Sequence, residues 1–289
     1  MRVTDLSSLA RAIDPRYPTV GAIVAVAVVV TVAGGGFQLL QGAGLQESAL
    51  WGVDAGLAVF LAWALGRELD PEHEFSAFVG SGLALAGLLL FGAPGLLALF
   101  WMLLVLRLVN RTTGLPAKIL DSLAVLGLGL WLAWQENWVY GLATALAFLL
   151  DSRLHPPLVR HMVFAGGALL GTLGMAIARD MPSNGAWQNP ALVWVVVVAS
   201  LLFVLIIPAS RQIRARCDVT DQRVQPARVQ SAQILALVTA IAIAGWAGQQ
   251  GVVDLFPLWA AMLGTPLYWI VGSIFRRRRR VPPGGSGPA

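Results

Sequence analysis

The sequence predicts an all-α protein, a polytopic integral membrane bundle of about ten transmembrane helices with the N-terminus and the C-terminus in the cytoplasm. Three observations predict this class. Hydrophobic residues make up 57% of the 289 positions and charged residues only 12%. Apolar runs long enough to enter a bilayer repeat along the whole chain. Basic residues lie in the short segments between those runs, which is typical of membrane proteins.

Ten apolar runs are expected to form the helices. The sequence does not decide whether the third, fourth and sixth runs cross the membrane fully, because they are short or closely spaced. The runs are 18–38, 49–66, 75–91, 94–109, 116–134, 137–151, 161–178, 190–209, 230–248 and 252–275. The first run could also belong to a signal peptide, but its length favours a retained anchor. The expected organisation is a cytoplasmic N-terminal segment (1–17), one transmembrane helical domain (18–275) and a basic, then disordered, cytoplasmic tail (276–289).

The distribution of basic residues tests this topology independently of hydropathy. With the N-terminus inside, 19 of the 20 lysine and arginine residues fall in cytoplasmic segments, as the positive-inside rule requires. The exception is Arg179. We therefore expect a bacterial or archaeal cytoplasmic (inner) membrane, multi-pass location, with anionic lipid headgroups bound by the run Arg276–Arg280.

Composition also excludes several classes of function. The net charge of +5 does not indicate a nucleic-acid partner, because the basic residues are not gathered with aromatic residues on a soluble face. A single cysteine, Cys217, rules out a disulfide framework and a cysteine-based metal site. Short loops leave no room for a soluble catalytic domain, so a substrate would be handled between the helices or at their ends. No metal-binding motif was identified.

The predicted cytoplasmic ends of the helices carry most of the polar chemistry. Candidate catalytic residues are Asp70, Glu74, Arg111, Asp151 and His155, which could together hold an anionic headgroup or a metal pyrophosphate. The alternative is that these are solvated loop charges that only fix the topology.

Four more charged residues lie inside or beside apolar runs, where an unpaired charge is costly. Arg107 and Asp121 border two runs near the cytoplasmic side, and pairs between Arg107 and Asp121 or between Arg111 and Asp151 would remove the cost. Asp54 and Asp254 lie near the outer side. Asp254 precedes Pro257 and the stretch 264–266, so the last run is expected to be kinked or broken, as in ion-coupled carriers. These four residues are the candidates for a substrate or ion path.

Two families share features with the chain. Its length, ten runs and inside termini resemble the drug/metabolite transporters, although no duplicated family motif is found. Its acidic loops after the second and sixth runs are distantly similar to those of UbiA-type intramembrane prenyltransferases, whose NxxxDxxxD and DxxxD motifs hold magnesium and the substrate pyrophosphate. The corresponding positions are Gly66, Asp70, Glu74, Asp151 and His155. Gly66 and His155 depart from the motifs, so membership of neither family follows.

The sequence is compatible with three functions. The first is a small-solute carrier or permease-like protein, based on the compact architecture with Asp54 and Asp254. The second is an intramembrane enzyme that acts on an isoprenoid or lipid phosphate at the cytoplasmic face, and this one alone would need a divalent metal such as Mg²⁺. The third is a non-catalytic subunit of a membrane complex. The sequence decides neither the substrate nor the oligomeric state.

Overall fold

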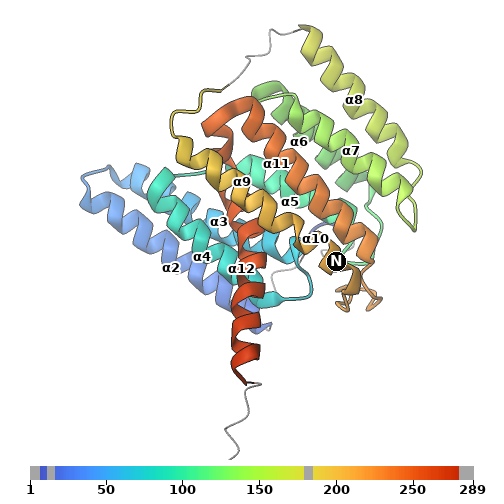
Figure 1. Cartoon of the computed structure of the whole chain (residues 1–289). Helices are drawn as coiled ribbons and strands as arrows, with labels where there is room; N and C mark the ends of the chain where they lie inside the picture. Colours follow the sequence, from blue (N-terminus) through green and yellow to red (C-terminus); the bar gives the residue numbers. More distant parts are fainter. Residues whose placement is uncertain (1–6, 12–16, 179–184, 280–289) are drawn as a thin grey trace, which may run out of the picture.

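The computed structural model describes residues 7–11, 17–178 and 185–279, and these residues form a helical bundle without strands (Figure 1). An isolated bridge between Arg216 and Arg223 is the one β-type pairing in the described part of the chain. The helices are α2 (Pro18–Leu40), α3 (Leu45–Leu69), α4 (Glu74–Phe91), α5 (Leu96–Asn110), α6 (Ile119–Gln135), α7 (Val139–Arg153), α8 (His161–Ala178), α9 (Pro190–Val204), α10 (Ile206–Ala209), α11 (Pro226–Asp254) and α12 (Phe256–Arg279). A 3₁₀ turn, η1 (Ser210–Gln212), follows α10.

Six helical segments of the described chain are long and apolar enough to cross a membrane: α2, α3, α4, α8, the stretch Pro190–Gln212 and α11. Helices α5 and α7 have 15 residues each. At 1.5 Å per residue such a helix is about 22 Å long, less than the roughly 30 Å of a hydrocarbon core. The helical membrane character is thus supported, and the third predicted run, now α4, has sufficient length.

The connections gather at two ends of the bundle. At one end, the α5–α6 connection bonds to the long connection before α11 through Asp218 N to Thr112 O (3.1 Å). Glu72, between α3 and α4, accepts hydrogen bonds from the backbone N–H of Arg214 and Ala215. We call this the basic end, defined by residues 7–11, 70–73, 111–118, 154–160 and 210–225. The segments expected to be cytoplasmic therefore meet one another.

Small residues let certain helices approach closely. A Cβ atom on Gly52 of α3 would lie 2.4 Å from the backbone oxygen of Thr31 on α2, and one on Gly264 of α12 would lie 2.5 Å from the backbone nitrogen of Gly80 on α4. A Cβ atom on Gly166 of α8 would meet nothing within 4 Å. Helix α8 thus lies at one edge of the bundle and α2 at another, both largely exposed (Figure 1).

The last expected run, 252–275, is broken near its start, because α11 ends at Asp254 and α12 begins at Phe256, just before Pro257. Helix α12 runs without interruption through Pro266. A further non-helical residue, Gly248, lies inside α11, with φ of 61° and ψ of −140°. Its neighbours pair with the segment before α9, since Gly185 N donates to Trp246 O (2.9 Å) and Gln249 N donates to Ala186 O (3.3 Å). Of the predicted tail 276–289, the first four residues continue α12, and Arg280 onward lies outside the described residues.

Candidate functional site

Asp151 is the centre of a buried charge cluster at the basic end. It lies in the last turn of α7 and is fully buried. The Arg111 guanidinium donates to both carboxylate oxygens, from Nε at 2.8 Å and from Nη2 at 2.7 Å. Arg228 donates from Nη1 at 2.7 Å, and His161 Nδ1 lies 2.7 Å from the second oxygen. The predicted Arg111–Asp151 pair is confirmed, and we call these four residues the Asp151 cluster.

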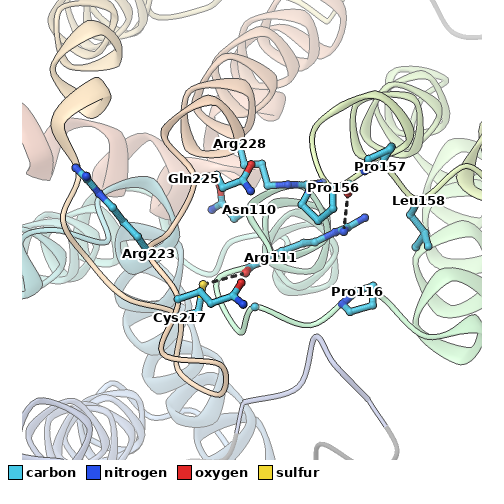
Figure 2. Close-up of a pocket in the computed structure, with 12 residues that line it drawn as sticks. Asn110, Arg111, Pro116, Pro156, Pro157, Leu158, Cys217, Arg223, Gln225 and Arg228 are labelled. Atoms are coloured by element: carbon cyan, nitrogen blue, oxygen red, sulfur yellow. Dashed lines mark hydrogen bonds between the residues drawn. The ribbon is translucent and has the colours of Figure 1, made fainter.

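The backbone aims Arg111 at this cluster. Its φ of 49° places it in the left-handed region, where it ends α5. This conformation is uncommon for a residue with a side chain and turns the chain sharply at a helix C-terminus. Arg111 Nη1 also donates to Pro156 O at 2.9 Å, so one side chain holds the α5–α6 and α7–α8 connections together (Figure 2).

Arg228 joins more of the backbone than any other described side chain at this end. It is 2% exposed in the first turn of α11. Besides Asp151, its guanidinium donates to four backbone oxygens, those of Val109, Leu154, His155 and Pro156, at 2.8 to 3.0 Å. All five of its N–H groups therefore have acceptors. Arg228 can contribute its field to a ligand, but it has no free donor.

Ser122, His161 and Asp151 lie in contact in this order, with a hydrogen bond between Ser122 and His161 and an ion-pair contact between His161 and Asp151. His161 Nε2 lies 2.8 Å from Ser122 Oγ, while Nδ1 faces Asp151. This order of groups occurs in nucleophilic triads. However, all three side chains are fully buried, and the Ser122 hydroxyl also has Lys118 O at 3.0 Å as an acceptor. These contacts therefore orient His161 within the bundle, and the three residues offer no accessible nucleophile.

A second buried carboxylate, Glu68, organises the neighbouring helix ends. Arg107 Nε donates to it at 3.1 Å, and Thr112 Oγ1 donates at 2.9 Å. Arg11 lies 3.6 Å from Glu68 and 3.0 Å from Asp218. The expected pair between Arg107 and Asp121 is therefore wrong, because Arg107 on α5 bonds to Glu68 on α3.

Asp121 instead caps the start of α6. It accepts hydrogen bonds from the backbone N–H of Ser8 (2.8 Å) and Lys118 (3.0 Å) and from the Ser7 and Ser8 hydroxyls. A carboxylate in the first turn also interacts favourably with the helix dipole. The N-terminal segment is thereby fastened across the basic end.

The remaining candidate catalytic residues lie in separate groups. Asp70 is paired with His73 at 3.1 Å, and Glu74 with Arg67 at 3.2 Å. The His155 side chain is exposed, and its backbone oxygen accepts from Arg228. Within the described chain, no three histidine, cysteine, aspartate or glutamate residues gather in a way that could hold a metal ion. Asp151 is paired with arginine side chains, and Asp70 is paired with His73.

A cavity of about 260 Å³ lies beside the Asp151 cluster (Figure 2). Its polar lining comprises Asn110, Arg111, Cys217, Gln222, Arg223, Gln225 and Arg228, and its apolar lining comprises Gly114, Pro116, Pro156, Pro157 and Leu158. Three guanidinium groups and no carboxylate therefore line it. We call it the arginine cavity.

The two outer acids lie away from this site. Asp54 is half-buried within α3, and Asp254 ends α11, where Gln250 donates to it at 2.8 Å and Gly95 N donates to its backbone oxygen at 3.0 Å. Glu136, between α6 and α7, lies near Asp254. Burial, and secondarily the negative charge of Asp254, raise the pKa of Glu136 above its usual range.

Sequence reasoning did not single out Glu68, Ser122, His161 or Arg228 as members of the site, although each lies in or beside a segment that it considered. For Glu68, His161 and Arg228, the local signal was an ionisable side chain next to an apolar run, and Ser122 carried no such signal. A comparison with protein-family models found no match, and comparisons with curated proteins and with solved structures found no significantly similar chain. The geometry of the basic end is therefore the basis for assigning a function.

Proposed function

We propose that the protein is a small-solute carrier or permease-like membrane protein in which the Asp151 cluster closes a path between the helices at the cytoplasmic end. The observation that supports this proposal is the burial of one carboxylate among two arginines and a histidine from α5, α7, α8 and α11. The basic end is assigned to the cytoplasm by the positive-inside rule.

The physical argument concerns what such a cluster contributes. Buried ion pairs add little net stability compared with apolar packing, because desolvation offsets the attraction between the charges. In an apolar bundle, ionisable groups of this kind are typical of substrate paths and gates. An ion-paired contact can also exchange its partners for water when the helices separate, which an apolar contact cannot do at similar cost. The cluster therefore fits a closing contact better than a structural core.

Opening of this path can be tested without knowing the substrate. Ala147 is fully buried on α7, one turn before Asp151. In a Cys217→Ser background, Ala147→Cys should be labelled by a membrane-impermeant maleimide added to the cytoplasmic side of membrane vesicles. Ala84→Cys, equally buried on α4 and away from the cluster, is the matched control and should not be labelled.

Adding Asp151→Asn should accelerate labelling of Ala147→Cys, because the seal loses its central charge. The proposal is wrong if Ala147→Cys stays as unreactive as Ala84→Cys, with and without Asp151→Asn. That result would favour the role of a fixed, non-catalytic subunit.

A second candidate is the intramembrane enzyme acting on an isoprenoid or lipid phosphate, which the arginine cavity favours. Incubation of the purified protein with farnesyl diphosphate and magnesium chloride tests it by release of pyrophosphate. Asp70→Asn and Asp151→Asn should each abolish any release. Glu47→Gln, an exposed substitution on α3, serves as the control.

A further inference from the structure

We infer that the arginine cavity binds an oxyanion, either a free phosphate or the phosphate of a lipid headgroup. The inference extends the proposed function. It rests on that function only where the bound anion is taken to be the solute that the protein transports. Binding is therefore measured without transport, so that the two proposals can fail separately.

The charge balance of the wall is the first argument. Asp151 carries one negative charge, while the two guanidinium groups that it bonds to carry two positive charges, so this group has an excess of at least +1. Asp151 lies behind the arginines and does not line the cavity. The neighbouring group is balanced, because Glu68 and Asp218 face Arg11 and Arg107. The uncompensated charge is thus located at the cavity.

The available donors are the second argument. Arg111 uses its Nε, one N–H of Nη1 and one N–H of Nη2, which leaves two N–H groups without acceptors among the described residues. Among the described residues, Arg223 donates only from its Nε, to Ile213 O, so its two terminal nitrogens have no acceptor in that part of the chain. Two guanidinium groups with free donors match a tetrahedral oxyanion, which accepts several charge-assisted hydrogen bonds.

Burial increases the effect of these charges. Arg111 is 8% exposed and Arg228 is 2% exposed, and three prolines, Pro116, Pro156 and Pro157, supply an apolar side of the wall. Attraction between a buried charge and an ion is screened less than at an open surface. Gln222 and Gln225 add amide donors at the rim.

Cys217 provides a probe inside the cavity, because it is the only cysteine of the chain and lines this wall. Purified protein in neutral detergent is treated with a negatively charged and a positively charged methanethiosulfonate, and each rate is divided by the rate of that reagent with 2-mercaptoethanol. The normalised rate should be higher for the anionic reagent. Arg223→Gln should lower the anionic-to-cationic ratio by about three- to tenfold, as expected from removing one charge at short range.

Three variants control the measurement. Arg223→Lys keeps the charge and should retain most of the ratio. Arg153→Gln removes an exposed charge outside the cavity and should leave the ratio unchanged. Cys217→Ser removes the thiol and gives the background. Arg223 is exposed, so its substitution is compatible with folding, which size-exclusion chromatography verifies.

Binding of an anion in the arginine cavity is measured as protection of Cys217 from uncharged N-ethylmaleimide. Sodium phosphate in detergent should slow the reaction relative to sodium chloride at equal ionic strength, and less so in Arg223→Gln. Nanodiscs of phosphatidylglycerol should protect more than nanodiscs of phosphatidylcholine if the anion is a lipid headgroup. Protection by either source supports the inference, and an unbiased reagent ratio together with no protection by either source overturns it.

Discussion

Asp151→Asn is expected to destabilise the protein strongly, because it removes the only negative charge within the Asp151 cluster. Asp151 is fully buried and receives three hydrogen bonds from Arg111 and Arg228, whose guanidinium groups are themselves almost fully buried. Removing one partner of a buried ion pair costs about 3–5 kcal/mol. With an unfolding entropy of about 2.1 cal/mol/K per residue, a chain of 289 residues would lose about 5–8 °C in Tm.

Thermal unfolding of the purified protein in detergent, followed by tryptophan fluorescence, measures this shift. Glu74→Gln is the matched control, because Glu74 is also a carboxylate paired with an arginine, but its side chain is 50% exposed. An exposed pair contributes about 0–1 kcal/mol, so the control should shift Tm by less than about 2 °C. Equal shifts for the two variants would refute the reasoning that burial of the charge determines the cost.

Three more predictions follow from single positions. Gly52→Ala should lower Tm, because its Cβ atom would lie 2.4 Å from a backbone oxygen of α2, whereas Gly36→Ala, with nothing within 4 Å, should not. Gly248→Ala should lower the free energy of unfolding by about 1 kcal/mol or more, and Tm with it, since φ of 61° with ψ of −140° is accessible almost only to glycine. Gly245→Ala is its control, and equal Tm values for the two variants would contradict this reading. Burial raises the pKa of the Cys217 thiol, so its maleimide reaction should increase with pH through a midpoint above that of free cysteine; a midpoint at or below the free value would contradict the burial.

The positions of the helices could be predicted from the sequence because hydropathy is a local property. The run expected at 161–178 is α8 (His161–Ala178), and the run expected at 94–109 is α5 (Leu96–Asn110). Basic residues between the runs likewise identified the segments that meet at the basic end. Whether all ten helices cross a membrane, and in which orientation, stays a prediction.

The partners of the charges depended on the tertiary structure. Arg111 and Asp151 were expected as a pair, and the structure confirms them, but Arg228, 77 residues further along the chain, joins the same carboxylate. The rotation of each helix about its axis and the path of the connections decide which side chains meet, and neither is visible in a linear pattern. For the same reason, Arg107 bonds to Glu68 and not to Asp121.

The sequence by itself determined that this protein is a bundle of apolar helices with its basic residues gathered in alternate connections, because composition and spacing along the chain decide both. Only the tertiary structure decided that one carboxylate is enclosed by two arginines and a histidine, and that an arginine-lined cavity without a carboxylate lies beside them. The physical reason is that a buried charge is stabilised by whichever groups reach it in three dimensions. Those groups come from α7, α8, α11 and the residue that follows α5, and they span positions 111 to 228.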